Sequence, residues 1–411
     1  MRASLPEAGE AWPELKARMA AMGGGDVDWR HGRAAVYVFN AGEDIEAVQE
    51  AAYTMYMAEN GLGPSAFPSL KSMEEAVIGY GLSLLHAPEG AAGSITSGGT
   101  DSITMALKAA RDHARRTRGV TGPVNIVLPR SAHLAFDKAA ALMEIEVRRV
   151  ALKELLADPA AIDAAADGQT VMIVGSAPCF PYGLIDPIGE LGRLAEARGL
   201  WLHVDACVGG YAAPFVRLNG GDIPDFDFAV PGVSSMSADL HKYGFCAKGA
   251  STVLFRSAEL HKAMIFDFRD WPGGRMVTPT LAGTRPGGAI AAAYAVMSYL
   301  GVEGYRARHK QVTDAREIIE AGLRARGYQV QGRPQLGLIA YSGMTNPGAL
   351  WMKLRERGWF TSTTSEPPGL HLMLSPVHLG VAQTYLDDLD WAAKALGDTP
   401  APAGEAARYG G

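Results

Sequence analysis

The chain has 411 residues, of which 48% are hydrophobic, and its formal net charge is −6. This length and apolar content predict a soluble globular protein with one large domain and one smaller domain. The acidic balance and the lack of a dense run of Lys and Arg argue against nucleic acid as a partner.

The three cysteines are odd in number and show no CxxC spacing: Cys179, Cys207 and Cys246. Neither a disulfide framework nor a zinc site is therefore expected, and we predict no metal. A reducing cytoplasm fits this cysteine usage best. The first residues include Glu7 and Glu10 and lack the apolar core of a secretory signal.

No membrane span is expected. The longest weakly polar run, residues 286–302, is rich in Gly and Ala and is shorter than the roughly 18 apolar residues that a spanning helix needs. We predict a buried helix here. Its small side chains would let it pack closely against another element or against a second subunit.

The N-terminal pattern predicts an amphipathic helix that ends at the glycines 23–25, a short strand over 34–39 and a helix over 44–59. Tyr37 lies in the predicted strand. It could be an active-site phenol or a half-buried strand residue.

A glycine-rich turn at 93–102 leads directly into a helical pattern with Ile103, Met105 and Leu107 on its apolar side. Free amides at a helix start, with glycines that let an anion approach, form a phosphate cradle. Hydroxyls at Ser97 and Thr100 would add to it. The alternative is an ordinary helix cap at Thr100.

The next section alternates strands and helices. Strands are predicted at 124–128, 147–150, 171–175 and 201–205, and helices at 133–143 and 188–198. Successive units of this kind predict an α/β fold with a mostly parallel sheet that is covered on both faces. In such sheets ligands bind beyond the carboxyl ends of the strands.

Two polar residues follow predicted strands at that edge. Asp205 could pair with a pyridinium nitrogen and keep it protonated, or it could cap the turn before Gly209 and Gly210. His133 could stack on a cofactor ring as a neutral imidazole, or it could cap the helix that it begins.

The stretch 237–251 contains Lys242, with His241 before it and small residues behind it. This pattern suits a lysine on a tight loop that attacks an aldehyde, which indicates pyridoxal phosphate (PLP) as cofactor. A second cation at Lys248, together with burial, would favour the neutral amine that such an attack requires. The alternative is a solvated surface lysine.

Beyond a strand at 251–255 the pattern is less regular, and two helices are then predicted over 291–301 and 302–326. Strands at 336–340 and 371–374 and helices at 350–357 and 382–396 would build a small C-terminal domain. Residues after Thr399 predict a frayed tail. We therefore divide the chain into an N-terminal helical segment (1–60), a large PLP-binding domain (61–300) and a small domain (301–411).

Several motifs in this order resemble the sphingosine-1-phosphate lyase family, a branch of the group II decarboxylase-like, fold-type I PLP enzymes. They are Thr96–Ser102, Ala132–His133 with 135–139, Gly175–Pro178 with Pro181 and 185–188, His203–Cys207 with 209–210, Ser237–Asp239 with 241–244, Lys248–Gly249, Thr284–Gly287 and Pro367–Leu372. The resemblance runs from about Tyr37 to Leu389. It implies a fold-type I PLP-dependent transferase fold with a mostly parallel large-domain sheet and a smaller C-terminal α+β domain.

The resemblance also assigns roles. It makes Lys242 the lysine that carries PLP, Asp205 the partner of the pyridine nitrogen and His133 the residue stacked over the ring. The residues that it places at the cofactor phosphate are Gly99, Thr100, His241 and, from a second subunit, the loop Gly283–Thr284.

Because the loop Gly283–Thr284 would come from a second subunit, the resemblance implies an obligate homodimer with a composite active site. The resemblance places two further residues, Lys248 and Tyr37, at the substrate.

Two departures from the family pattern stand out. The family's Asn-Pro-Leu-His stretch is Asn60–Gly63 here, so a substrate-facing histidine is missing and Gly63 takes its place. The N-terminal membrane segment of eukaryotic members is also absent, as in shorter bacterial relatives.

Two enzyme classes fit these residues. A carbon–carbon (aldehyde) lyase would cleave a phosphorylated 2-amino-3-hydroxy compound, such as sphingosine 1-phosphate, in a retro-aldol step. A group II amino-acid decarboxylase would use the same cofactor to break the bond to a carboxylate. The bond held perpendicular to the ring is the one that breaks, so substrate contacts decide between them. A scaffold that has lost activity is disfavoured because Lys242, Asp205 and His133 are all present.

Overall fold

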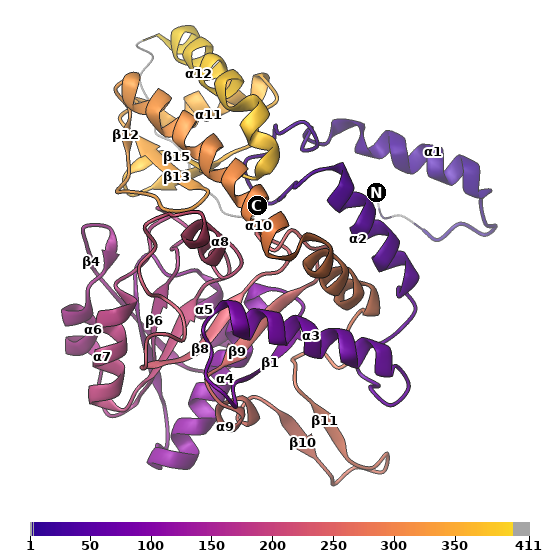
Figure 1. The fold of residues 1–411 in the computed structure, drawn as a ribbon, viewed down its shortest axis with the longest axis vertical. Coiled ribbons are helices and arrows are strands. Elements are labelled where there is room, and N and C mark those ends of the chain that lie inside the picture. Colours follow the sequence, from indigo (N-terminus) through magenta and orange to yellow (C-terminus); the bar gives the residue numbers. More distant parts are fainter. Residues whose placement is uncertain (1, 3, 398–411) are drawn as a thin grey trace.

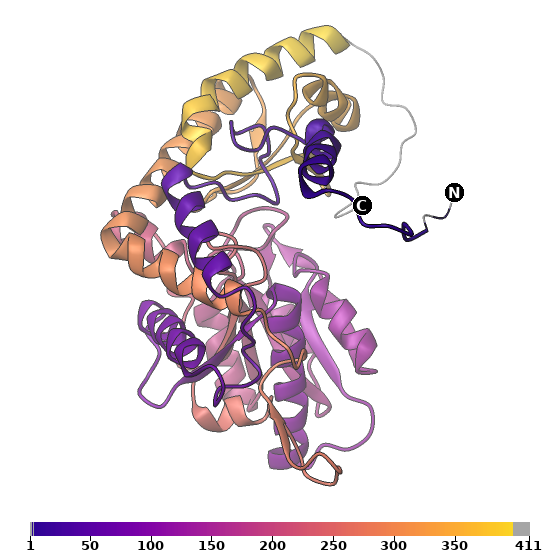
Figure 2. The same ribbon diagram turned by 90° about the vertical axis from the view of Figure 1, so that its right-hand side faces the viewer.

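The computed structural model describes residues 2 and 4–397, with one seven-stranded sheet, one four-stranded sheet and two small hairpins (Figure 1). The longest helix, α10, runs from the seven-stranded sheet to the four-stranded sheet, as Figure 2 shows. The tail predicted after Thr399 lies outside the described residues.

The helices are α1 (Trp12–Met22), α2 (Glu43–Met55), α3 (Pro68–Leu84), α4 (Gly99–Arg118), α5 (Ala135–Leu142), α6 (Pro159–Ala165), α7 (Ile188–Arg198), α8 (Ala213–Leu218), α9 (Ala258–Lys262), α10 (Gly287–Ala325), α11 (Pro347–Glu356) and α12 (Ala382–Leu396), with short 3-10 turns at Gly23–Gly25 and Pro376–Val381. The strands are β1 (Ala92–Thr96), β2 (Asn125–Pro129), β3 (Glu146–Val150), β4 (Leu152–Lys153), β5 (Leu156–Ala157), β6 (Thr170–Ser176), β7 (Trp201–Asp205), β8 (Val233–Ala238), β9 (Ser251–Phe255), β10 (Phe266–Phe268), β11 (Met276–Thr278), β12 (Gln329–Val330), β13 (Leu338–Ser342), β14 (Ser362–Ser365) and β15 (Pro368–Met373).

The large sheet confirms the predicted α/β class. Its strand order is β1-β9-β8-β7-β6-β2-β3, and the five strands from β8 to β3 are parallel to one another. At the other side of the sheet, β9 runs antiparallel to both of its neighbours, β8 and β1. The glycine-rich turn at 93–102 begins within β1, which is the edge strand. Every residue of β2, β6 and β7 is buried because helices cover both faces of the sheet.

The parallel strands end in register at one edge. Ser176 of β6 lies beside Asp205 of β7, and Asp205 lies beside Ser237 of β8. This edge therefore carries three polar side chains in a row, at the place where ligands bind in sheets of this kind.

The two helices predicted over 291–301 and 302–326 are one element, α10, with a break at Gly301. Gly301 has φ 53° and ψ −172°, a backbone conformation that glycine adopts readily because it lacks a Cβ. Beyond this break α10 packs on the four-stranded antiparallel sheet, whose order is β12-β13-β15-β14.

The strand predicted over 34–39 is wrong. Only Ala34 forms a bridge, to Phe360, and the chain then bends at Tyr37, which has φ 65°. The backbone of Ala35 bonds to the carbonyl of Phe360 and to the amide of Met373. These bonds attach the N-terminal segment to the C-terminal sheet, which a local pattern of apolar residues cannot reveal.

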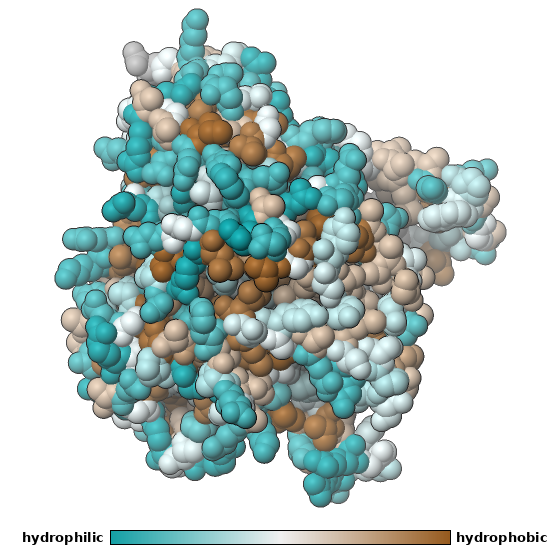
Figure 3. All heavy atoms as spheres, viewed as in Figure 1, coloured by the Kyte–Doolittle hydropathy of each residue, from teal (hydrophilic) through white to brown (hydrophobic). Residues whose placement is uncertain are grey.

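In Figure 3, hydrophobic side chains gather across the middle of the face, and others lie on its upper part and on the hairpin β10–β11. The irregular region predicted after 255 forms this hairpin, which leaves three aromatic side chains about half exposed: Phe266, Phe268 and Trp271. None of the helices described combines the length and the apolar character that crossing a membrane requires.

Gly209 is expected to be essential for the packing beside the site. A Cβ at this position would lie 2.1 Å from the backbone oxygen of Ala177, on the loop that follows β6. We expect Gly209→Ala to lower the free energy of unfolding by about 1–3 kcal/mol, because backbone must move to relieve the overlap. Urea denaturation measures the change.

The matched control is Gly168→Ala, where no atom lies within 4 Å of the added Cβ. Equal stability of the two variants would contradict the close approach.

Candidate active site

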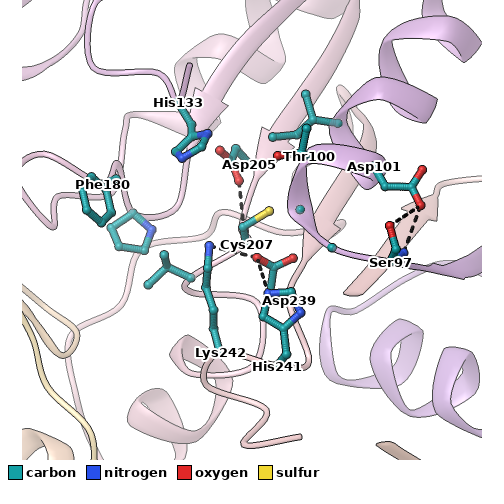
Figure 4. A pocket seen from close by; sticks show the side chains of 15 residues that line it. Ser97, Thr100, Asp101, His133, Phe180, Asp205, Cys207, Asp239, His241 and Lys242 are labelled. Carbon is teal, nitrogen blue, oxygen red and sulfur yellow. Dashed lines mark hydrogen bonds and ion pairs between the residues drawn. The ribbon is translucent and has the colours of Figure 1, made fainter. Parts of the chain in front are cut away.

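A cavity of about 370 Å³ opens at the carboxyl ends of the parallel strands (Figure 4). The strand ends, the start of α4 and the loop after β8 supply its walls. It is lined by Ser97, Gly98, Gly99, Thr100, Asp101, Ile103, His133, Pro178, Phe180, Asp205, Cys207, Val208, Asp239, His241 and Lys242.

The structure brings six of the predicted site residues together in this cavity: Gly99, Thr100, His133, Asp205, His241 and Lys242. Three others do not line it: Tyr37, Lys248 and Thr284. Thr284 instead accepts a hydrogen bond of 3.2 Å from the side-chain amide of Asn60. The loop that carries Gly63 and the loop that carries Thr284 are thus joined to each other, outside the cavity.

Lys242 forms an ion pair with Asp239, whose Oδ2 lies 2.9 Å from Nζ. Burial lowers the pKa of Lys242, but the Asp239 carboxylate, with smaller effects of Cys207 and Asp205, raises it, and the net pKa lies above its ordinary value. The expectation that burial and Lys248 keep this amine neutral is therefore wrong for this arrangement. Asp239 holds the amine in its charged form.

The lowered pKa that was expected of Lys242 is found at Lys248 instead. Desolvation of its ammonium group, and then the charge of Lys242, lower the pKa of Lys248 to about 8, although other parts of the residue remain exposed. Its Nζ donates to the backbone oxygens of Tyr37 at 2.8 Å and His241 at 3.1 Å. Lys248 thereby ties the bend at Tyr37 to the loop that carries Lys242.

The start of α4 has the form of an anion cradle. Gly98 is the N-cap and offers no side chain to the first amides of the helix, so the alternative of a cap at Thr100 is wrong. A Cβ on Gly99 would lie 2.7 Å from Sγ of Cys207 and 2.9 Å from Oδ2 of Asp239. Glycine is required here because the helix start approaches the strand ends so closely.

His133 lies between the start of α5 and the cavity, and the N-cap of α5 is Leu134. Its Nδ1 accepts a hydrogen bond of 3.1 Å from the amide of Ala135, at the start of α5, while its ring lines the cavity. Burial lowers the pKa of His133, which favours the neutral imidazole. The ring is therefore fixed in place and apolar enough to stack on a planar group.

Asp205 accepts hydrogen bonds on Oδ1 from the amide of Cys207 at 3.1 Å and from the hydroxyl of Ser237 at 3.3 Å. Behind Ser237, the ring of His203 bridges two serines: Nε2 lies 3.2 Å from Oγ of Ser237, and Nδ1 lies 2.8 Å from Oγ of Ser235. The indole of Trp201 donates to Ser235 at 2.7 Å.

Chemistry fixes the direction of this chain of bonds. An indole N–H only donates and a carboxylate only accepts, so Ser235 donates onward to His203 and Ser237 donates to Asp205. Burial lowers the pKa of His203 to about 4, so the ring is neutral and carries its one proton on Nε2. The relay directs every donor toward Oδ1 of Asp205 and fixes the orientation of this side chain.

Three buried polar atoms in the cavity wall have no hydrogen-bond partner within the described residues. They are Oδ1 of Asp101, Oδ1 of Asp239 and Nδ1 of His241. Buried polar atoms without partners are rare in folded proteins and mark a place where a ligand or water completes the bonding.

These features fit PLP. The cavity offers an amine for an aldehyde (Lys242), a helix start for a phosphate (Gly99), a carboxylate for a ring nitrogen (Asp205) and a flat neutral ring for stacking (His133). Among residues 2 and 4–397, no group of three or more His, Cys, Asp or Glu side chains is arranged to hold a metal ion.

Fold and site together define a PLP-dependent enzyme of the α/β class. Residues 3–342 match the pyridoxal-dependent decarboxylase conserved domain. The chain belongs to this family, and within it to the sphingosine-1-phosphate lyases. It is a PLP-dependent lyase.

Three relatives illustrate this placement. The sphingosine-1-phosphate lyase of Oryza sativa is 38% identical over 94% of this chain and 74% of its own length. The structure of a Burkholderia pseudomallei sphingosine-1-phosphate lyase is 34% identical, with a TM-score of 0.91 over 96% of this chain and 93% of that one. A Methanocella arvoryzae protein named "Probable L-tyrosine/L-aspartate decarboxylase" is 38% identical over 79% of this chain and 84% of its own length.

Sequence reasoning missed three contributions to the site. Asp239 stands three residues before Lys242, a spacing that could have indicated a contact across one turn of chain. Phe180 lines the cavity from the loop after β6, and His203 supports Asp205 from within β7. No local signal marks Phe180, because its position depends on how that loop folds back over the strand ends.

The role of Asp239 is testable in the apoprotein. We expect Asp239→Asn to lower the pKa of Lys242 by roughly one to three units, the effect of removing an adjacent opposite charge. A larger fraction of the amine is then neutral at any given pH near neutrality. The pH dependence of Lys242 acetylation by acetic anhydride, followed by mass spectrometry, measures the midpoint.

Asp101→Asn is the matched control, since Asp101 lines the same cavity but contacts Ser97 rather than Lys242. An unchanged acetylation midpoint in Asp239→Asn would show that the ion pair does not control this lysine.

Proposed function

We propose that the protein cleaves the Cα–Cβ bond of a phosphorylated 2-amino-3-hydroxy compound such as sphingosine 1-phosphate. The observation that carries this proposal is the match to sphingosine-1-phosphate lyases along nearly the whole chain, which includes the residues of the cavity. The expected products are a long-chain aldehyde and phosphoethanolamine.

When bound, PLP supplies an aldehyde that captures the substrate amine and a protonated ring that withdraws electrons from the breaking bond. We assign to Lys242 the covalent attachment of the cofactor. Both hydrogen bonds that Asp205 accepts within the described residues fall on Oδ1, which leaves Oδ2 to keep a proton on the ring nitrogen. His133 would cover the ring and exclude water from that face.

We assign the cofactor phosphate to the start of α4, where the amides of Gly99 and Thr100 and the imidazole of His241 line the cavity. Lys248 and Tyr37 are proposed to hold the phosphate and hydroxyl end of the substrate. In the structure Lys248 bonds to backbone oxygens instead, so this role requires its ammonium group to turn toward the bound substrate. Its pKa of about 8 lets it exchange a proton near neutral pH.

The alternative is amino-acid decarboxylation, which the Methanocella arvoryzae relative favours through its name and its 38% identity. The two reactions share every residue assigned to the cofactor. They differ in which substrate bond is held perpendicular to the ring, and so in the contacts beyond the cofactor.

The products decide between the two reactions. We expect the holoenzyme to release a long-chain aldehyde from sphingosine 1-phosphate, weakly because Gly63 replaces a family histidine. A lost hydrogen-bonding contact lowers the specificity constant roughly 10-fold to 150-fold. Because the loop of Gly63 lies outside the cavity of its own chain, Gly63→His is expected to raise this constant at the site of a partner subunit, and only Cβ of Ala66, at 3.7 Å, lies near an added Cβ.

Borohydride reduction followed by peptide mapping should place the cofactor on Lys242, and Lys242→Ala should fold but show no turnover. Release of carbon dioxide from an amino acid, with no aldehyde from any phosphorylated base, would replace the lyase assignment by the decarboxylase. An adduct on Lys248 would overturn the assignment of Lys242.

We further propose a homodimer with a composite active site, in which Thr284 reaches the cofactor phosphate of the partner subunit. Two observations support it: Thr284 does not line the cavity of its own chain, and the nearby hairpin β10–β11 exposes Phe266, Phe268 and Trp271. Apolar aromatic side chains exposed together are typical of an interaction surface.

Subunit mixing tests this arrangement. Lys242→Ala and Thr284→Asp each inactivate the homodimer on this proposal, because one loses the amine and the other repels the phosphate. Equal co-expression should restore about a quarter of wild-type activity, since half of the dimers then contain one intact site. No recovery in isolated heterodimers would mean that Thr284 acts within its own subunit.

We also propose a cytoplasmic location and retain the division into 1–60, 61–300 and 301–411. Three buried free cysteines support a reducing compartment. The break of α10 at Gly301 supports the second boundary.

A further inference from the structure

A second cavity, of about 590 Å³, lies directly beside the cofactor pocket. The two cavities share His133 and Phe180, which stand on the same side of the cofactor pocket in Figure 4. The second cavity is bounded by the loop after β2, the hairpin β4–β5 and strand β14 with the turn that follows it. A ligand that reacts in the first cavity can therefore extend into the second.

The walls of this cavity suit a neutral, mainly apolar ligand. Its charged lining residues are Arg130 and Glu366, and their side chains pair with each other at 3.0 Å. The cavity therefore offers no unpaired charge to a phosphate or a carboxylate. Its apolar lining, hereafter the apolar wall, includes Leu134, Leu152, Leu155, Phe180 and Pro181, and β14 adds the hydroxyl-bearing residues 362–365.

The hairpin β4–β5 brings Leu155 to this cavity in a turn whose backbone conformation is unfavourable for leucine. Lys153 pairs with Leu156, so Glu154 and Leu155 form a two-residue turn, with φ 53° and φ 68°. Turns of this geometry strongly prefer Asn-Gly or Asp-Gly, because other side chains are strained at positive φ. A leucine at such a position is unfavourable locally and points to a function for its side chain.

The hairpin is held by a small apolar cluster separate from the main core. Leu152, Leu155 and Leu156 pack against three buried residues of the loop after β6: Cys179, Tyr182 and Leu184. This loop also carries Phe180, which joins the two cavities. The strained turn is therefore fixed to the loop that leads to the reacting groups.

We propose that the second cavity holds the hydrocarbon chain of a long-chain amino alcohol phosphate, with its amine in the cofactor pocket. The inference rests on the proposed function and names the part of the substrate that the cofactor pocket cannot hold. Each methylene removed from water should then raise affinity roughly threefold to fourfold, until the cavity is filled. The apolar wall, and Leu155 in particular, is expected to set the preference for chain length.

The test compares sphingosine 1-phosphate with an analogue whose chain is truncated to eight carbons. Leu155→Asn and Leu155→Gly both suit the positive φ of the turn, and the strain that they relieve offsets the packing that they remove from the apolar cluster, so we expect the melting temperature to change little. We expect either change to lower the long-chain to short-chain ratio of kcat/KM about tenfold, the loss of one apolar side-chain contact. The specificity constant of the short analogue should stay within about twofold of wild type.

Calorimetric titration of both compounds into the apoprotein gives a second readout that does not depend on turnover. The long-chain compound should bind more tightly to wild type, and Leu155→Asn should remove most of this difference. Leu142→Asn is the matched control, because Leu142 is 70% exposed at the end of α5 and lies outside the cavity. It should leave the ratio and both affinities unchanged.

An equal effect of Leu155→Asn on the two chain lengths, or no effect on either, would overturn the assignment of this cavity. Absence of aldehyde together with chain-length-dependent binding that Leu155→Asn removes would instead overturn the proposed lyase reaction. The two failures are thus distinguishable in one set of proteins.

Discussion

The ion pair between Lys242 and Asp239 is the interaction on which the rest of the site depends. A charged amine in a partly enclosed cavity is costly unless a partner compensates it, and Asp239 does so at 2.9 Å. Because Asp239 is only 2% exposed, the surrounding backbone must close around it, and Gly99 and Cys207 approach it without room for a further side chain. Holding this pair therefore also fixes the helix start that is suited to a phosphate.

The register of β6, β7 and β8 is a second constraint on the site, because it decides which side chains meet at the edge of the sheet. That register sets Ser237 beside Asp205, and the alternation of side chains along β7 and β8 places Trp201, His203 and Ser235 in one buried layer behind them. Polar side chains inside a sheet are unfavourable unless each is bonded. Here the polar side chains form one continuous chain of hydrogen bonds that ends at Asp205. Residues inside the sheet thereby orient the carboxylate at the edge of the sheet.

The space beside the cofactor pocket exists because the molecule is divided into two sheets. The loop after β6 carries Phe180 and Tyr182, and the hydroxyl of Tyr182 donates a hydrogen bond to the backbone oxygen of Glu366, between β14 and β15 of the four-stranded sheet. Helix α10 connects the two sheets, and the N-terminal segment is bonded to the four-stranded one. The chemistry of the cofactor is thus built on one sheet, whereas the space for the remainder of a substrate lies between the two.

The sequence by itself determined the alternation of strands and helices, the mostly parallel sheet and the place of Asp205 and His133 at its edge, because apolar periodicity and strand ends are local properties. Lys242 was grouped with them by the family resemblance, since the strand before it, β8, was not predicted. Tertiary structure decided the rest. Asp239 reverses the expected charge state of Lys242, Lys248 bonds to backbone oxygens outside the cavity, and Tyr37 lies in a bend rather than a strand. These outcomes depend on groups distant in the chain, and neither a pKa nor a contact between distant segments can be obtained from spacing alone.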